Sequence, residues 1–324
     1  MAEIGNDVLK AAAVLANNEL VAIPTETVYG LAANALDEKA VAQIFEVKNR
    51  PTYNPLILHI AHKSELRKYV KEVPPIAEKL IEKFWPGPLT LLLPKKENVP
   101  DIVTASLPNV AIRVPNHSLT LQLLQSIDFP VAAPSANPFG YISPTTPEHV
   151  QRQIGERIPY ILDGGACQQG VESTIVGFED GMPVVFRLGA IPLEELREVA
   201  GDLKLYKKSV TRIESPGMLP YHYSPKTPLY ITSNIQDLLS SFEPHETGVI
   251  TFKEHIQNLP DGHLKVLSPS GDLSEAARNL YSALHEMDRM NLKAIITEQF
   301  PEEGLGKTLN DRLERAGKRT QEEL

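Results

Sequence analysis

The 324-residue chain has one cysteine, no long hydrophobic run and no excess of basic residues. With Cys167 alone, the chain has neither an internal disulfide framework nor a Cys-x-x-Cys zinc or redox motif, and this usage suits a reducing cytoplasm. No stretch approaches the ~18 consecutive apolar residues of a membrane helix, and the start has no basic segment, so we expect neither a membrane-spanning nor a secreted protein. The net charge of −9 argues against nonspecific binding of nucleic acid by the whole surface, but leaves room for a local basic cleft.

The hydrophobic pattern of the first two thirds of the chain is typical of an α/β domain with a mixed sheet. Short apolar runs predict strands at 20–23, 56–60, 89–93, 111–114, 131–133, 160–162, 174–178 and 184–187. Helical periods lie at about 6–18, 37–48, 74–84, 118–126, 147–154 and 192–199. We therefore predict a first α/β domain over residues 1–205.

The last third of the chain has its own alternation of strands and helices. Residues 206–228 contain several prolines and no clear period, which indicates an extended linker. Strands are predicted at 229–232, 247–252, 264–267 and 293–297, with helices at 234–241, 272–291 and 304–317. This order favours a second, smaller domain over 229–324 with a parallel, doubly wound sheet.

Polar residues gather directly after the predicted strands of the first domain. The segment PTETVYG, residues 24–30, offers two hydroxyls, a carboxylate and a phenol, although a simple turn explains it as well. The helix that must end before Pro51 places Lys48 and Arg50 at its end, where they either complement the helix dipole or bind phosphates. His59 is either a strand histidine with a satisfied hydrogen bond or a ligand group. Because ligands of open α/β sheets bind beyond the ends of strands, the placement indicates a binding site.

Two arginines in apolar strands and a Ser-x-Asn pair extend this pattern. Arg113 lies in AIRVP and Arg187 in VFRLGA, where an unpaired guanidinium is costly, so Arg113 should face a carboxylate or a ligand anion. Ser135 and Asn137 share a face if the backbone there is extended, and can then bind one ligand. The glycine-containing loop at 162–174 matches neither a Walker nor a dinucleotide motif. The residues alone thus predict an α/β protein that binds a small anionic ligand.

Several segments, taken together and in order, resemble the YrdC-like threonylcarbamoyl-AMP synthase family. They are PTETVYGLAANA, KNRPTYNPLILHI, WPGPLTLLL, AIRVP, APSANPFGYISPT, LDGG, VESTIV and VFRLGAI. The resemblance covers most of residues 7–200. The later segment SPGMLPYHYSP resembles the linker of the longer members, with Ser224 where alanine is usual, and those members carry a Rossmann-like C-terminal domain. The resemblance implies a twisted YrdC-like catalytic domain, a linker that closes over its cavity as a lid, and this second domain.

The activity that the resemblance implies is a nucleotidyl transfer. Family members make L-threonylcarbamoyladenylate from L-threonine, bicarbonate or CO2, and ATP with Mg²⁺, and release pyrophosphate. A downstream tRNA threonylcarbamoyltransferase uses the product for the N6-threonylcarbamoyl modification of adenosine in tRNA. We therefore expect a cytoplasmic tRNA-modifying enzyme, with weak tRNA binding left open.

The resemblance also assigns roles to individual positions. Those matching family positions around threonine are Thr27, His59, Arg113 and Ser173, and those around ATP are Arg50, Asn54, Ser135, Ser143 and Arg187. Lys48, Arg50, Ser135 and Asn137 match the family's catalytic set. The lid would bring Tyr223 or its neighbour His222 to the nucleotide. No metal ligand within the protein is expected.

Three other functions remain open at this stage. A concave basic surface also suits an RNA-binding module, against which the net charge of −9 argues. Carbamoyl transfer from carbamoyl phosphate occurs in hydrogenase-maturation relatives, but their cysteine-based zinc motifs cannot be built from one cysteine. A threonine sensor is the third.

Overall fold

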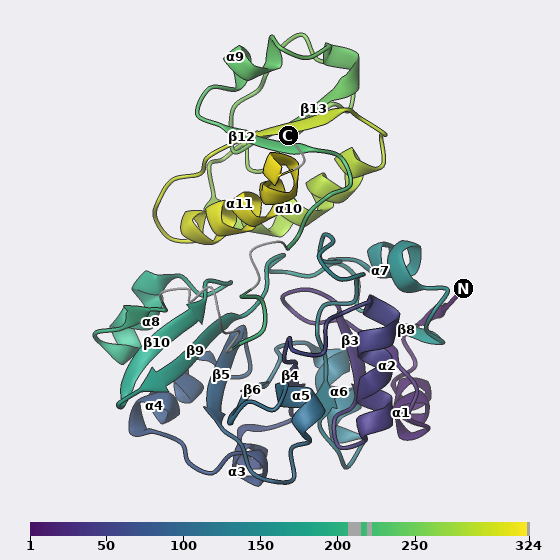
Figure 1. The fold of residues 1–324 in the computed structure, drawn as a ribbon, viewed down its shortest axis with the longest axis vertical. Coiled ribbons are helices and arrows are strands. Elements are labelled where there is room, and N and C mark those ends of the chain that lie inside the picture. Colours follow the sequence, from purple (N-terminus) through teal and green to yellow (C-terminus); the bar gives the residue numbers. More distant parts are fainter. Residues whose placement is uncertain (207–214, 219–221, 323–324) are drawn as a thin grey trace. The chain divides into compact units, whose positions relative to one another are not determined.

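The computed structural model describes residues 1–206, 215–218 and 222–322 of the chain. The chain divides into two compact units (Figure 1). The first consists of Met1–Phe139, Pro144–Gln168 and Glu172–Met218, and the second of Gly140–Ser143, Gln169–Val171 and Leu219–Leu324. Two short stretches that the sequence pattern assigned to the first domain therefore group with the second unit. Within the described residues, no helix combines the length and apolar character needed to cross a membrane.

The first unit is built on a mixed sheet, as the sequence pattern predicted. In the described residues its strands are β1 (Glu3–Gly5), β2 (Val21–Ile23), β3 (Gly30–Asn34), β4 (Ile57–His59), β5 (Leu89–Pro94), β6 (Asn109–Arg113), β7 (Val131–Ala132), β8 (Tyr160–Leu162), β9 (Thr174–Glu179), β10 (Met182–Arg187) and β11 (Lys204–Leu205). They follow the order β1-β8-β2-β3-β7-β4-β6-β5-β9-β10-β11. The β4-β6 and β5-β9 pairs are parallel, whereas β5-β6, β3-β7 and β9-β10 are antiparallel.

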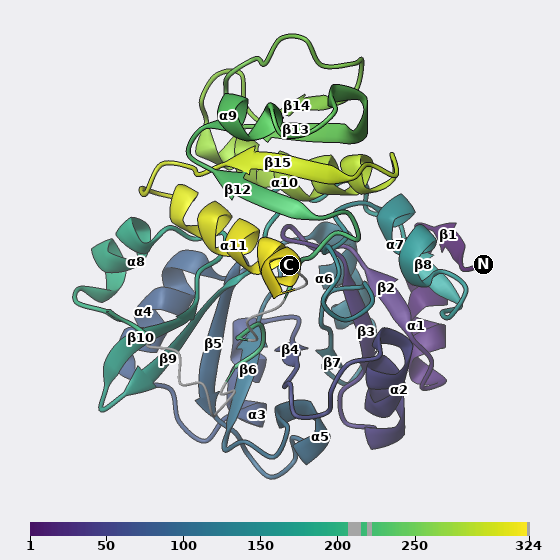
Figure 2. The same cartoon turned by 45° about the horizontal axis from the view of Figure 1, so that its top comes forward.

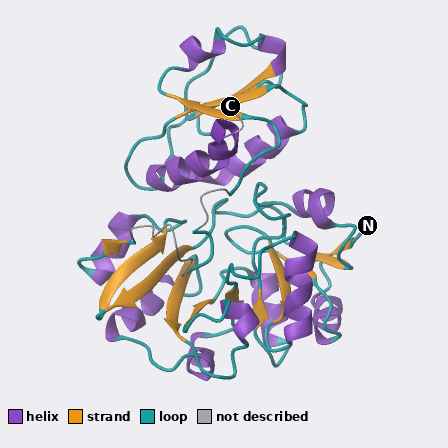
Figure 3. Cartoon of the chain, in the orientation of Figure 1, coloured by secondary structure: helices purple, strands orange, loops and turns teal. Residues whose placement is uncertain are grey.

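Helices connect these strands, so helices and strands are intermixed in each unit (Figure 3). Those of the first unit are α1 (Val8–Ala16), α2 (Glu38–Lys48), α3 (Leu66–Tyr69), α4 (Pro75–Phe84), α5 (Asp101–Thr104), α6 (Ser118–Gln125), α7 (Pro147–Ile154) and α8 (Leu193–Ala200), with a 3₁₀ turn at Lys63–Glu65. Helix α2 starts where the Asp37 carboxylate accepts a hydrogen bond from Ala40 N. It ends at Lys48 because Asn49 adopts a left-handed conformation, with φ of 51°.

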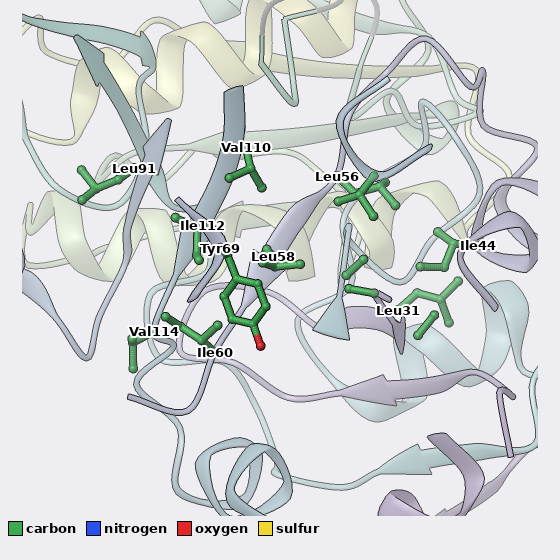
Figure 4. Packing of buried hydrophobic residues seen from close by; sticks show 14 of the residues in the cluster. Leu31, Ile44, Leu56, Leu58, Ile60, Tyr69, Leu91, Val110, Ile112 and Val114 are labelled. Atoms are coloured by element: carbon green, nitrogen blue, oxygen red, sulfur yellow. The ribbon is translucent and has the colours of Figure 1, made fainter. Parts of the chain in front are cut away.

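The core of the first unit lies between this sheet and its helices. Figure 4 shows Leu58, Ile60 and Ile112 around the ring of Tyr69. In the same figure Leu31 of β3 lies against Ile44 of α2, and both are fully buried. A well-packed core of this kind fixes the strand ends, which carry the predicted site residues His59, Arg113 and Arg187.

The second unit has a small parallel sheet, which confirms the predicted fold class. Its strands β12 (Leu229–Thr232), β13 (Thr247–Thr251), β14 (Leu264–Val266) and β15 (Ala294–Glu298) follow the order β12-β15-β13-β14 (Figure 2). Its helices are α9 (Ile235–Leu239), α10 (Leu273–Asp288) and α11 (Gly306–Glu322), with a 3₁₀ turn at Pro244–Glu246. Helix α10 starts where the Asp272 side chain accepts hydrogen bonds from Ser274 N and Glu275 N.

The hydrophobic pattern of the sequence did not predict three strands of the first unit. Strand β3 has the sequence GLAAN, whose small residues carry little strand preference, yet it is central and pairs with both β2 and β7. Strands β1 and β11 have three and two residues and lie at the two edges of the sheet. Pairing with neighbouring strands, β2 and β7 for β3, β8 for β1 and β10 for β11, stabilises these strands beyond their own weak preference.

Candidate active site

Strand register places several predicted residues along one edge of the first unit's sheet. His59 and Arg113 pair with one another at the carboxyl ends of β4 and β6. On the next strand, β5, Leu91 pairs with Ile112, so Thr90 lies beside Arg113 at the same edge. Ser173 directly precedes β9, which runs parallel to β5. Because the sheet is mixed, this edge combines carboxyl ends of some strands with amino ends of others.

Arg113 is held by the loop between β2 and β3. Its Nη2 donates to Glu26 Oε2 at 2.9 Å, and its Nη1 donates to Thr27 Oγ1 at 3.2 Å. Thr27 Oγ1 also lies 2.7 Å from Thr25 Oγ1. Burial lowers the pKa of the Arg113 guanidinium, and the Glu26 charge acts in the opposite direction. The sequence predicted that Arg113 faces a carboxylate or a ligand anion, and Glu26 is such a carboxylate.

His59 lies beside Arg113 and is neutral. Burial lowers the pKa of His59 from 6.5 to about 3, and the Arg113 charge acts in the same direction. Its Nδ1 lies 3.1 Å from Ile57 O, a contact in which a protonated Nδ1 donates and Nε2 is left as an acceptor.

Ser173 and Arg187 form a second contact group, although the resemblance assigned them to different substrates. Arg187 Nη2 donates to Ser173 Oγ at 2.9 Å, and its Nε donates to Ser173 O at 3.0 Å. Ser173 Oγ lies 2.7 Å from Thr90 Oγ1. Gly189 makes this packing possible, because a Cβ there would lie 2.3 Å from Thr174 N.

Lys48 is a buried cation held by backbone carbonyls. Its Nζ donates to Ser135 O and to Asn137 O, each at 2.5 Å. Burial, together with the neighbouring Arg50 guanidinium, holds the pKa of Lys48 well below its usual 10.5. Ser135 pairs with Gly30 in an antiparallel bridge, and the backbone turns directly after it, at Ala136, because Asn137 N donates to Ser135 O at 3.1 Å. The two side chains therefore do not share a face in the way that an extended strand would impose.

Arg50 and Asn54 lie next to one another just before β4. Arg50 Nε donates to Asn54 O at 3.2 Å, and Nη2 donates to Pro55 O at 2.8 Å. The Asn54 side chain is fully buried, and neither its Nδ2 nor its Oδ1 has a hydrogen-bond partner among the described residues. An unsatisfied buried amide of this kind is typical of a position that binds a ligand.

Ser143 and Tyr223 belong to the second unit and are described within it. Ser143 O accepts a hydrogen bond from His285 Nε2 of α10 at 3.1 Å. Tyr223 is fully buried with φ of 69°, and Arg312 and Arg315 of α11 lie 4.9 and 5.3 Å from its ring centre. Such a strained conformation persists only where the surroundings impose it.

Three further findings concern predictions about the linker, the metal and the cysteine. Residues 207–214 and 219–221 of the predicted lid lie outside the described residues, so the lid stays a prediction, and so does the role of His222. Across 1–206, 215–218 and 222–322, no group of three His, Cys, Asp or Glu side chains is placed to hold a metal ion. Burial raises the pKa of the Cys167 thiol to about 12, so this thiol stays protonated.

The sequence pointed to the carboxylate of the PTETVYG segment, which is Glu26, but did not pair it with Arg113. The acid was visible in the loop after β2, and Arg113 was expected to need a carboxylate, but many acids in the chain satisfied that need equally well. Thr90 and Gly189 were missed because only the pairing of β5, β9 and β10 brings them to Arg113 and Ser173.

Comparison with known proteins agrees with this arrangement. The Sua5/YciO/YrdC family model, described as "Telomere recombination", matches residues 13–189, and the "Threonylcarbamoyl-AMP synthase, C-terminal domain" model matches residues 191–317. The chain is 42% identical to a threonylcarbamoyl-AMP synthase of Pyrococcus abyssi, covering 94% of this chain and 92% of the relative. It is 41% identical to one of Bacillus subtilis, covering 95% and 92%. The crystal structure of P. abyssi Sua5 complexed with L-threonine superposes with a TM-score of 0.91 at 39% identity, covering 98% of each chain. This chain therefore belongs to the Sua5/YciO/YrdC family, in the form that includes the C-terminal domain of threonylcarbamoyl-AMP synthases.

Proposed function

We propose that this protein is an L-threonylcarbamoyladenylate synthase, a nucleotidyltransferase that converts L-threonine, bicarbonate or CO2, and ATP to threonylcarbamoyl-AMP and pyrophosphate. The observation that carries the proposal is the pair of buried cationic groups in one unit, Arg113 with Thr27 and Lys48 with the 135–137 segment. The first suits the carboxylate of an amino acid, and the second suits a phosphate. Relatives that carry the synthase name, and that this chain matches over 92% of their length, support the same assignment.

The residues on the threonine side orient the first substrate. The Arg113 fork binds the threonine carboxylate, and Thr27 fixes the fork from one side. Neutral His59 offers its Nε2 as an acceptor for the threonine hydroxyl. Threonine bound in this way presents its amine to CO2, and the carbamate forms without a covalent bond to the enzyme.

The cations on the nucleotide side stabilise charge in the second step. The carbamate oxygen attacks the α-phosphorus of ATP in line, the bond to the bridging oxygen breaks, and pyrophosphate leaves with the electron pair. Lys48, Arg50 and Arg187 are the buried cations that we propose stabilise the charge that grows on the phosphate oxygens. Asn54, Ser135 and Asn137 position the nucleotide, and Ser143 and Tyr223 are proposed to contact it as well. Mg²⁺ enters as the metal of the Mg·ATP substrate.

The experiment that tests the proposal is an assay of the pure protein with Mg·ATP, L-threonine and bicarbonate. We expect pyrophosphate release and a threonylcarbamoyl-AMP mass that depend on all three substrates, so that omission of any one abolishes the product. Absence of the product under complete conditions would overturn the proposal. Salt-sensitive tRNA binding without ATP turnover would instead favour an RNA-binding module, and threonine binding alone a sensor.

The place of the reaction in tRNA modification follows from the product. Threonylcarbamoyl-AMP is an activated acyl adenylate, and its chemistry calls for an acceptor amine such as the N6 of a tRNA adenosine. We propose that a downstream tRNA threonylcarbamoyltransferase in the cytoplasm uses it.

A further inference from the structure

Glu26 is a buried carboxylate with no assigned role in the proposed reaction. It is 3% exposed, and its Oε2 accepts hydrogen bonds from Arg113 Nη2 at 2.9 Å and from Asn116 N at 3.1 Å. Its partner Arg113 is also 3% exposed. The contacts account for one oxygen of the carboxylate only.

Each member of this ion pair keeps one buried atom without a partner among the described residues. Glu26 Oε1 is an acceptor with no donor, and Arg113 Nε is a donor with no acceptor. An orphaned buried polar atom costs roughly 1–3 kcal/mol, more for a charged group, so a pair that keeps two of them suits a ligand. The two open atoms are complementary to an amino acid zwitterion, whose ammonium donates and whose carboxylate accepts.

We infer that Glu26 Oε1 binds the α-ammonium group of threonine and takes its proton. The inference rests on the proposed function, because threonine must present a neutral amine to CO2. An N–H bond of the ammonium breaks, an O–H bond forms on Oε1, and the electron pair stays on nitrogen. That pair then forms the N–C bond with CO2. The second amine proton goes to the hydroxide left when bicarbonate supplies CO2, which gives water, and Glu26 returns its proton to solvent.

The other titratable groups around Glu26 do not compete for this proton. Arg113 is a cation, and burial raises the pKa of Cys167, which therefore has no charge to offer. Burial lowers the pKa of both His117 and His59, so each is uncharged at neutral pH and does not attract an ammonium group by its charge. Glu26 is thus the acceptor whose geometry and charge both suit the ammonium.

The contact is tested by calorimetric binding without ATP, which does not depend on catalysis. L-Threonine is compared with (R)-3-hydroxybutanoate, which lacks only the α-amino group. We expect wild type to prefer threonine at least ~10-fold and Glu26→Gln to bring that ratio close to one. A purely structural role for Glu26 would weaken both ligands equally and leave the ratio unchanged, which would overturn the inference. Wild type without a preference would overturn it too.

The proton transfer is tested by the pH profile of product formation. Glu26→Gln should lower kcat/KM for threonine about 100-fold at pH 7. This deficit should shrink as pH rises, because more threonine then carries a free amine in solution. A deficit that does not change with pH would overturn the proton transfer. If wild type itself makes no threonylcarbamoyl-AMP, the proposed function fails, whereas the binding ratio still decides the contact.

Two further variants keep the tests interpretable. Glu198→Gln, on the exposed side of α8, is the matched control and should behave as wild type. If circular dichroism shows that Glu26→Gln does not fold, Glu26→Asp is measured instead, since it keeps the charge beside Arg113. Its shorter carboxylate cannot reach both Arg113 and the ammonium, so the threonine preference should fall. An unchanged preference in that folded variant would overturn the inference.

Discussion

Arg113 and Lys48 are both buried cations of the first unit, but the protein compensates them differently. Arg113 donates to the Glu26 carboxylate, so the pair carries no net charge. Lys48 donates only to the neutral carbonyl oxygens of Ser135 and Asn137 in the described residues. A compensated pair can orient a zwitterion of zero net charge, whereas an uncompensated cation favours a polyanion. In the proposed reaction, the compensated pair would therefore bind the amino acid, and the uncompensated ammonium would bind the triphosphate.

Removing the uncompensated cation should have the largest effect. Lys48→Ala should lower threonylcarbamoyl-AMP formation about 1,000-fold, because the developing phosphate charge loses a fixed cation. The fold should remain, since in the described residues Lys48 bonds only to two backbone carbonyls, so its removal leaves no charged partner buried alone. Pyrophosphate release measures the effect, and Lys39→Ala, exposed on the same helix, is the control. Unchanged turnover in Lys48→Ala would contradict the assignment.

Substitution of Arg113, the cation compensated by Glu26, should change the KM for threonine only. Arg113→Lys keeps the positive charge but loses the planar fork, so the KM for threonine should rise about 100-fold while the KM for ATP changes little. Steady-state kinetics with each substrate varied in turn measures both values. Equal changes in the two KM values would place Arg113 outside the threonine subsite.

The neutral histidine beside Arg113 should make stability depend on pH. The pKa of His59 falls from 6.5 to about 3 in the folded protein, so the unfolded chain binds more protons between these values. The contribution is complete above pH 6.5 and is lost as pH falls toward 3, by about 2 kcal/mol at pH 5. Urea unfolding at pH 8 and pH 5 measures it. His59→Gln should lose less stability than wild type over this interval, and an identical loss would show that His59 is not the cause.

The smallest expected effect is on the KM for ATP, and it should distinguish Asn54, which we propose binds the ligand, from Asn310, which stabilises the fold. Asn54 has an unsatisfied buried side chain, so Asn54→Ala should leave the free energy of unfolding nearly unchanged but raise the KM for ATP about 10-fold. In the second unit, Asn310 is fully bonded to Phe300 N and O, so Asn310→Ala should cost roughly 1–3 kcal/mol of stability. Thermal unfolding measures the stability of the two variants, and steady-state kinetics measures their KM for ATP. Equal destabilisation by both would contradict it.

Prediction from the sequence succeeded where a residue and its immediate neighbours are enough to impose the structural feature. The end of α2 at Lys48 followed from Pro51, and the apolar run around Arg113 demanded a counter-charge wherever the strand lay. It failed for β3, whose GLAAN sequence has no local strand signal. The lid and the domain boundaries stay predictions.

The sequence by itself determined the α/β class of both sheets, the positions of Lys48 and Arg50 at the end of a helix, the place of Arg113 in an apolar strand, and the family resemblance. It could do so because periodicity, breakers and motif order are local properties. Only the tertiary structure decided that Glu26 compensates Arg113 and that Ser173 bonds to Arg187. It also decided that Lys48 bonds to carbonyls 87 and 89 residues away. These contacts depend on sheet order and on which polar atoms are left without water, and both arise only when distant segments pack together.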